Sequence, residues 1–261
     1  MQNKTNKDIE CGLVTGAAGF LGIEHCKSIL DNYSGLVMID INKKKLNKSF
    51  YELKKKYPKK IIEKFNYDIT SEKKIKILDK ILKKKKLFSR VIINNACLDP
   101  KPNKLKKIDT NWNKELDVGL KGPYLLIEYF SKHMKNKKDG CIINIASDLS
   151  VIAPTQSIYK NIYKNFVKPV SYSVIKHGLI GLTKYYAALL AEFKITCNAI
   201  SPAGVYNFQN KKFVKNLRKL IPMNRMANKM DIKNTVDFLI SKKQKFITGQ
   251  NIIVDGGRTI V

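Results

Sequence analysis

The sequence predicts an α/β fold, in which one doubly wound parallel sheet of about seven strands carries helices on both faces. Short apolar runs rich in β-branched residues alternate with longer amphipathic stretches from one end of the chain to the other. This alternation is typical of successive βαβ units. No internal repeat, linker or change of composition marks a second domain, so residues 1–261 are expected to form a single domain.

The length and composition suit one core. The chain has 261 residues, of which 44% are hydrophobic, and this is near the upper limit of a single domain. The expected strands lie near residues 11–15, 35–40, 61–66, 90–94, 140–146, 195–200 and 251–254. The expected helices lie near residues 20–31, 43–57, 71–86, 111–136, 172–192 and 231–241. Helix-length stretches separate most successive strands, so the strands should run parallel.

The formal net charge of +29 raises the question of nucleic-acid binding, because clustered basic residues neutralise phosphates. Only four of the 50 basic residues are arginines, whereas base and phosphate recognition favours the planar guanidinium. The lysines are spread over many short segments, and no aromatic stacking platform is interleaved with them. The charge is therefore expected to cover solvated faces, and nucleic acid is not an expected partner.

The sequence contains no run of roughly 18 apolar residues that could span a bilayer, and its beginning lacks the apolar stretch of a signal peptide. A cytoplasmic protein with no membrane partner is therefore expected. The five cysteines have neither a CxxC pair nor a histidine at metal-ligand spacing, so they are expected to be reduced core residues without a metal. They are Cys11, Cys26, Cys97, Cys141 and Cys197.

A glycine-rich turn follows the first expected strand, in the segment TGAAGFLG at residues 15–22. Gly16, Gly19 and Gly22 would allow a tight turn, a close approach to a pyrophosphate and close packing of the next helix on the sheet. The N–H groups at the start of that helix would then bind the phosphates of a dinucleotide. An ordinary turn between a strand and a helix is the alternative interpretation.

Asp40 ends the second expected strand, about 20 residues beyond the glycine-rich turn. A carboxylate at this point can accept both ribose hydroxyls of NAD and would repel the 2′-phosphate of NADP. NAD is therefore the expected cofactor, although Lys43, Lys44 and Lys45 lie close enough to weaken the discrimination. The alternative is that Asp40 caps the helix that starts near Asn42.

Six further motifs follow in an order that resembles the short-chain dehydrogenase/reductase family over nearly the whole chain. They are YDIT with Asp68, NNA at 94–96, INIAS ending at Ser147, YSVIK from Tyr172 to Lys176, NAISPAG at 198–204 and ITGQNIIVDGG at 247–257. The resemblance implies a Rossmann-type fold and an oxidoreductase with a nicotinamide cofactor. Within the family, the chain most resembles the oxidoreductases of flagellin modification and surface-glycan synthesis.

The resemblance also implies roles for individual residues. Ser147, Tyr172 and Lys176 correspond to the catalytic serine and the Tyr-x-x-x-Lys pair, and Asp68 corresponds to a residue beside adenine. The residues implied in cofactor binding are Gly16, Ala18, Gly19, Phe20, Leu21, Asp40, Ile41, Asp68, Ile69, Asn95, Ala96, Tyr172, Lys176, Pro202, Gly204 and Val205.

The pair of Tyr172 and Lys176 has a chemical rationale of its own. A tyrosine phenol has an ordinary pKa of about 10, which is too high for efficient acid–base catalysis at neutral pH. A nearby ammonium favours the phenolate, and residues four apart share one face of a helix. Tyr51 and Lys55 have the same spacing, but a solvated face of a lysine-rich helix explains them. Ser147 would bind the substrate oxygen while hydride moves between substrate and nicotinamide.

Three departures from the family pattern stand out. The glycine turn is spaced TGxxGxxG, as in the extended branch that handles sugar nucleotides, instead of TGxxxGxG. Gly119 in DVGLKG stands where the family carries its relay asparagine, so the usual proton relay lacks that residue. Ala203 replaces a common glycine, and Asn207 stands where a threonine often contacts the cofactor, although an amide can supply similar hydrogen bonds.

Tyr172 follows Ser147 by 25 residues, roughly twice the family's usual spacing, which indicates a loop inserted at 148–171 beside the substrate cleft. Aromatic rings can stack on a sugar and lysines can bind a phosphate, so this loop is expected to form a lid over an anionic sugar derivative. The alternative is that it covers its own domain or a neighbouring subunit. Its aromatic and basic residues are Tyr159, Lys160, Tyr163, Lys164, Phe166 and Lys168.

The sequence thus predicts an NAD(H)-dependent oxidoreductase that interconverts a secondary alcohol and a ketone on a sugar, sugar phosphate or nucleotide sugar of surface-glycan biosynthesis. One rival is a 3-oxoacyl reductase of lipid synthesis, which would prefer NADPH and an acyl-carrier substrate. The other is a family member that binds NAD(H) without turnover, which Gly119 and Ala203 make conceivable. The resemblance also implies a homodimer or homotetramer formed through residues 111–136 and 172–192.

Overall fold

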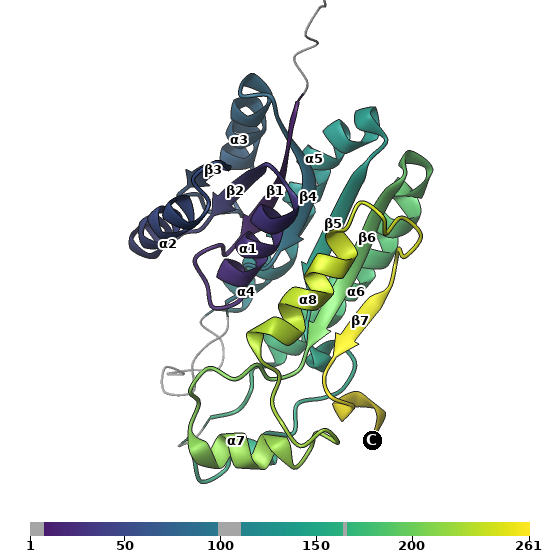
Figure 1. The fold of residues 1–261 in the computed structure, drawn as a ribbon. Coiled ribbons are helices and arrows are strands. Elements are labelled where there is room, and N and C mark those ends of the chain that lie inside the picture. The colour runs from purple at the N-terminus through teal and green to yellow at the C-terminus, as the bar shows by residue number, and fades with distance from the viewer. Residues whose placement is uncertain (1–7, 99–110, 164–165) are drawn as a thin grey trace, which may run out of the picture.

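A seven-stranded sheet forms the centre of the computed structural model, which describes residues 8–98, 111–163 and 166–261 (Figure 1). The strands are β1 (Ile9–Thr15), β2 (Gly35–Ile39), β3 (Ile61–Phe65), β4 (Leu87–Asn94), β5 (Gly140–Ile145), β6 (Ile195–Pro202) and β7 (Asn251–Val254). Their order across the sheet is β3-β2-β1-β4-β5-β6-β7, and every neighbouring pair is parallel. The predicted parallel sheet is therefore confirmed.

The helices differ from the sequence prediction in two places. A π-helical segment, Asp117–Lys121, interrupts the helix expected at 111–136 and divides it into α4 and α5. Helix α7 lies outside the expected helices, since only three of its eight residues are apolar. The α-helices are α1 (Gly22–Asn32), α2 (Lys43–Lys56), α3 (Glu72–Lys84), α4 (Trp112–Leu116), α5 (Gly122–Lys137), α6 (Val170–Leu190), α7 (Lys211–Arg218) and α8 (Lys229–Ile240).

Helices cover both faces of the sheet, and each face has its own buried core. Leu78 of α3, Phe130 of α5 and Tyr186 of α6 belong to the core on one face. Ile29 of α1 and Val236 of α8 belong to the core on the other, to which α2 also contributes. The inner strands are largely buried on both sides and consist of nearly continuous apolar runs, which is why the sequence located them well, whereas the edge strands β3 and β7 are only partly buried.

The order of the strands creates a crevice at one edge of the sheet. Strand β1 lies between β2 and β4, so the connections after β1 and β4 leave in opposite directions. Ligands of such sheets bind at this switch point, outside the carboxyl ends of the strands. Helix α7 lies beyond these ends (Figure 1) and contacts the short 3-10 helix Gln156–Tyr159. The fold thus gathers the segments after β1, β2, β4, β5 and β6 around one region.

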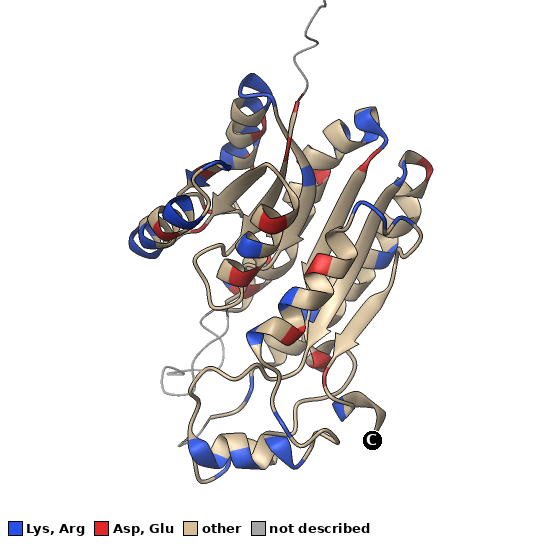
Figure 2. Ribbon diagram, in the orientation of Figure 1, with Lys and Arg blue, Asp and Glu red and all other residues tan. Residues whose placement is uncertain are grey.

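The basic residues are spread over several elements, among them α2, α3 and α7 (Figure 2). This distribution agrees with the expectation that the lysines cover solvated faces. Within the described ranges, no helix is both long enough and apolar enough to cross a membrane.

Candidate active site

A cavity of about 950 Å³ lies at the carboxyl ends of the strands. Its lining includes the glycine-rich turn, the ends of β2, β4, β5 and β6, part of the 148–171 segment and residues of α7. All the residues that the sequence assigned to the cofactor line this cavity except Ala18, and Ser147 lines it as well. The structure therefore brings together nearly all the predicted site residues.

The glycine-rich turn has little space for side chains. Gly16 has a φ of +59°, and a Cβ atom at Gly22 would lie 2.0 Å from the Gly16 carbonyl oxygen. Helix α1 begins at Gly22 without a side-chain cap from Leu21, and the N–H groups of Ile23 and Glu24 donate to the carbonyl oxygens of Gly19 and Leu21. The tight turn and the positive end of the helix dipole fit the phosphates of a dinucleotide.

Asp40 links the glycine-rich turn to the start of α2. Its Oδ2 atom accepts a hydrogen bond from the Ala18 N–H at 3.0 Å, and its Oδ1 atom accepts one from the Asn42 N–H at 2.8 Å. Ala18 does not line the cavity, but its backbone N–H helps to hold the Asp40 carboxylate in place. Asn42 caps α2 by accepting from the Lys45 N–H, so the capping role considered for Asp40 belongs to Asn42. The position of Asp40 in the cavity wall fits a ribose.

Hydrogen bonds join the ends of β1 and β4 at the bottom of the crevice. The Thr15 hydroxyl accepts from the N–H groups of Asn95 and Ala96, both at 3.0 Å. The Asn95 side-chain amide donates to the carbonyl oxygens of Thr15 and Gly16 at 3.0 and 3.2 Å. These bonds fix the NNA segment against the glycine-rich turn, as expected for two segments that line the same end of the cavity.

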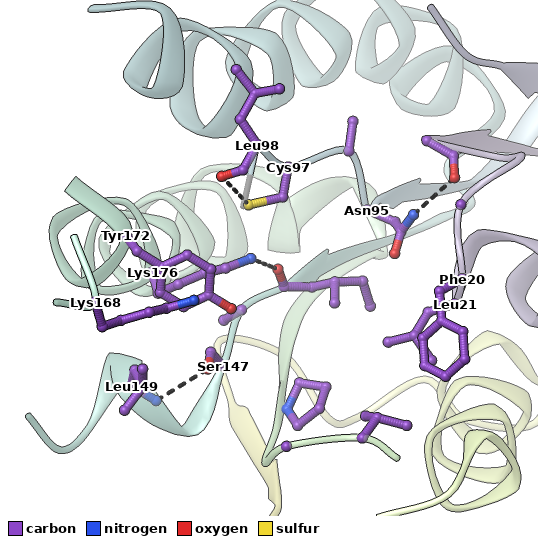
Figure 3. A pocket seen from close by; sticks show the side chains of 18 of the residues that line it. Phe20, Leu21, Asn95, Cys97, Leu98, Ser147, Leu149, Lys168, Tyr172 and Lys176 are labelled. Atoms are coloured by element: carbon purple, nitrogen blue, oxygen red, sulfur yellow. Dashed lines mark hydrogen bonds between the residues drawn. The ribbon is translucent and has the colours of Figure 1, made fainter. Parts of the chain in front are cut away.

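Tyr172 and Lys176 project into the cavity from successive turns of α6. The buried Lys176 Nζ donates to the Ile145 carbonyl oxygen at 2.8 Å and lies 5.4 Å from the centre of the Tyr172 ring. Ser147 follows β5 on the same side of the pocket. Figure 3 shows these three residues close together, with Phe20 and Leu21 of the glycine-rich turn across the pocket from them.

A buried ion pair supports the segment that carries Ser147. The Ser147 hydroxyl accepts from the Leu149 N–H at 3.2 Å and donates to Asp148 Oδ1 at 2.8 Å. Asp148 Oδ2 in turn binds Arg258 Nη1 at 2.5 Å. Asp148 and Arg258 both line the cavity, but their pairing cannot be seen in the sequence, because 110 residues separate the partners. The sequence position of Asp148, directly after Ser147, was the one feature that could have indicated a role for it in the site.

The 148–171 segment forms the aromatic wall of the cavity together with α7. Tyr159, Tyr163 and Phe166 line the cavity, and the Tyr159 ring stacks on Phe213 of α7 with 5.5 Å between ring centres. Rings 4.9 Å apart also join Tyr159 to Phe166. The wall is therefore held by packing within this part of the molecule.

The three lysines of the expected lid differ in their position relative to the cavity. Lys168 lines the cavity, and its Nζ atom lies 3.7 Å from the centre of the Tyr172 ring. Lys160 is exposed and does not line the cavity. Lys164 lies outside the described residues. The hypothesis that three lysines of this segment bind one anion in the cavity is therefore not supported for Lys160.

A family model described as enoyl-(acyl carrier protein) reductase matches residues 16–259. The chain belongs to the short-chain dehydrogenase/reductase family. It is an oxidoreductase of this family. The predicted fold and the predicted family are both confirmed.

Individual members of the family match almost the full length of the chain. The post-translational flagellin modification protein A of Campylobacter coli is 29% identical, over 94% of this chain and 96% of that protein. A 3-oxoacyl-acyl-carrier-protein reductase of Thermotoga maritima is 27% identical, over 95% and 97%. A solved short-chain dehydrogenase of Leptospira borgpetersenii with bound NAD⁺ is 28% identical, with a TM-score of 0.82, over 99% of this chain and 96% of that chain.

Gly119, which departs from the usual short-chain dehydrogenase/reductase pattern, has little room for a side chain. It lies in the π-helical segment, and a Cβ atom at this position would be 2.4 Å from Ile175 Cγ2 on α6. Ile175 stands between Tyr172 and Lys176 in the chain. The two helical segments approach so closely here that an asparagine would require Ile175 to move. The other unusual positions, Ala203 and Asn207, line the cavity.

Proposed function

We propose that the chain is an NAD(H)-dependent oxidoreductase that interconverts a secondary alcohol and a ketone, with residues 1–261 as one catalytic domain. One observation carries the proposal. A single cavity contains Ser147, Tyr172 and Lys176 on one side and the glycine-rich turn across from them (Figure 3), with Asp40 hydrogen-bonded to that turn. This arrangement provides a dinucleotide site and an acid–base group in one continuous space.

The residues of the cavity divide the work of the reaction among them. A bound nicotinamide supplies or accepts the hydride. The Tyr172 hydroxyl donates a proton to the substrate oxygen during ketone reduction and takes it back during alcohol oxidation. The Lys176 ammonium, held by the Ile145 carbonyl, favours the phenolate form electrostatically. After its bonds with Leu149 and Asp148, the Ser147 oxygen keeps one lone pair for a substrate hydroxyl.

The proposed preference for NAD rests on Asp40. Its carboxylate lines the cavity beyond β2, where it would accept the ribose hydroxyls and repel a 2′-phosphate. The Leptospira relative with bound NAD⁺ supports the same choice. The test is the ratio of initial rates with NADH and NADPH, which Asp40→Ala should reduce. If the wild type preferred NADPH, the choice of cofactor would be attributed to Lys43, Lys44 and Lys45 and not to Asp40.

We propose a sugar or sugar derivative of surface-glycan biosynthesis as the substrate. Two observations support it: the full-length similarity to the flagellin modification protein, and the aromatic wall of Tyr159, Tyr163 and Phe213, which suits stacking on a sugar ring. The second candidate is a 3-oxoacyl reductase, favoured by the Thermotoga maritima relative. A long acyl chain would require continuous apolar lining, whereas Tyr159, Tyr163 and Lys168 add polar groups to the lining of this cavity.

A screen of NADH absorbance tests the activity and distinguishes the two substrates. The panel contains sugars, sugar phosphates, nucleotide sugars and a 3-oxoacyl thioester. Tyr172→Phe should lower turnover by about 10² to 10⁴ while NAD binding persists, because the phenol transfers a proton and is not the main cofactor contact. Tyr51→Phe is the matched control, since Tyr51 begins the second Tyr-x-x-x-Lys sequence and is exposed. Near-normal turnover in Tyr172→Phe would refute the assignment.

We also propose that the chain forms a homodimer or homotetramer through α5 and α6. Large apolar side chains are exposed on these helices, among them Tyr124, Val174, Tyr185 and Leu189. Such side chains suit an interface between copies of the chain. Sedimentation of the wild type and of Tyr185→Lys tests the proposal, since a charge at this position should favour smaller species.

A further inference from the structure

We propose that Lys168, a residue of the 148–171 segment, is a second lysine of the active centre and stabilises the phenolate of Tyr172 from the face of its ring. The inference rests on the proposed acid–base role of Tyr172. It differs from the lid hypothesis, in which Lys168 binds an anionic group of the substrate.

The position of the ammonium group is the first support. Lys168 Nζ lies 3.7 Å from the centre of the Tyr172 ring, whereas Lys176 Nζ lies 5.4 Å from it. An ammonium at this distance from a ring is attracted to its π-electrons. When the phenol loses its proton, the negative charge spreads into the ring and the attraction increases. Lys168 therefore interacts more strongly with the phenolate than with the phenol.

The second support is the way in which the chain holds Lys168. The Gln156 side chain binds both backbone polar groups of Lys168: its Oε1 accepts from the Lys168 N–H at 3.0 Å, and its Nε2 donates to the Lys168 carbonyl at 3.4 Å. On the other side, Pro169 is the N-cap of α6, and its carbonyl accepts from the Tyr172 N–H at 3.2 Å. The backbone of Lys168 is thus fixed between Gln156 and the helix that carries Tyr172.

The third support is the balance of other charges around the start of α6. The Asp148 carboxylate on the 3-10 helix after Ser147 is paired with Arg258, so together they add little net charge. The Glu115 carboxylate of α4 accepts the hydroxyl hydrogen of Ser171. Among the described residues, the other ionisable groups on these elements or on the nearby cavity wall are Cys97, Lys114, Asp117, Tyr159, Tyr163, His177, Lys184, Tyr185 and Tyr186. Within the part of the chain that the structure describes, the ammonium groups of Lys168 and Lys176 both lie over the Tyr172 ring.

Two cations beside one phenol have a stronger effect than one. An opposite charge within about 4–6 Å typically moves a pKa by about 1 to 3 units toward the charged form. The two lysines also repel each other, and a phenolate next to both reduces this repulsion. With Lys168 in place, the pKa of the Tyr172 phenol would therefore be lower than with Lys176 alone, and Tyr172 could accept a proton from an alcohol at a lower pH.

The experiment follows the ionisation of Tyr172 directly, without substrate. Protein with isotope-labelled tyrosine is titrated by NMR in the presence of NAD⁺, and the Tyr172 signal is the one absent from Tyr172→Phe. Lys168→Met should raise the pKa of Tyr172 by about one unit, and Lys168→Arg should keep it near the wild-type value. Lys160→Met is the matched control, because Lys160 lies in the same segment but is exposed and outside the cavity lining.

Each outcome decides the question. An unchanged Tyr172 titration in Lys168→Met overturns the proposal, and a higher KM in that variant would then assign Lys168 to substrate binding. If Lys168→Met does not fold, Lys168→Gln and Gln156→Ala replace it, and a raised pKa of Tyr172 is expected in both; unchanged values overturn the proposal equally. Because no substrate is needed, the wrong choice of sugar substrate would not affect the result, whereas turnover by Tyr172→Phe would refute the proposed function itself.

Discussion

Replacing Arg258 by methionine would leave the Asp148 carboxylate buried without its cationic partner. The two side chains are only 6% and 3% exposed, so solvent does little to screen their attraction. Removing one partner of such a pair typically costs about 3–5 kcal/mol. Asp148 would keep its hydrogen bonds from Ser147 and Leu149, which favours the lower end, about 3 kcal/mol. At roughly 2–4 °C per kcal/mol for a domain of this size, Tm should fall by about 6–12 °C.

Thermal unfolding monitored by circular dichroism measures this effect, and a second arginine provides the control. Arg225 pairs with Asp231 through two nitrogens, but its side chain is 48% exposed, so Arg225→Met should cost at most about 1 kcal/mol. The double variant Asp148→Asn/Arg258→Met should regain part of the loss, because it leaves no unpaired charge. If Arg258→Met unfolds at the wild-type temperature, the pair does not stabilise the segment that carries Ser147.

Three further predictions follow from buried groups. Burial lowers the pKa of His25 from 6.5 to about 4. The unfolded chain therefore takes up a proton at a higher pH than the folded chain does. As the pH drops from 6.5 towards 4, the free energy of unfolding should fall by at most about 3 kcal/mol. Denaturant unfolding at several pH values checks this, with His25→Leu expected to flatten the dependence. Burial also raises the pKa of four cysteine thiols, to about 11 at Cys141, to about 12 at Cys11, and further at Cys26 and Cys197. An alkylating reagent should therefore modify only Cys97, which lines the cavity. Mass spectrometry should find one adduct, formed more slowly with NAD⁺ present; several rapid adducts would contradict the buried positions. Finally, Gly119→Asn should destabilise the protein by about 1–3 kcal/mol, and Ile175→Ala should reduce this penalty if the contact with Ile175 causes it.

The sequence could predict the sheet because the physics of a parallel sheet is local. Strands buried on both faces must be short apolar runs, and these are visible without knowledge of the partners. The glycine-rich turn and Asp40 were also predictable, since their spacing follows from the turn between β1 and α1 and from the end of β2. Helix α7 was not, because its few apolar residues pack on the 148–171 segment and not on the sheet.

The parts of the site that the sequence missed depend on contacts between distant segments. Asp148 meets Arg258 only because the end of β5 and the turn after β7 lie on either side of β6. The π-helical segment at Asp117–Lys121 and the close contact of Gly119 with Ile175 depend on how two helical elements approach each other. Lys168 belongs to an alternating pattern of aromatic and basic residues, but this pattern does not distinguish it from Lys160, which does not line the cavity.

The packing of α7 against the 148–171 segment affects how enzymes on this scaffold can diverge. The rings of Tyr159 and Tyr163 both contact Phe213 of α7, so replacing either segment alone would remove apolar partners of the other. The two segments form a unit that must be inherited or transplanted together. The turn that fits the dinucleotide belongs to the other half of the sheet and does not take part in this packing. A chimaera that exchanges both segments at once should therefore acquire a new substrate range and keep its cofactor.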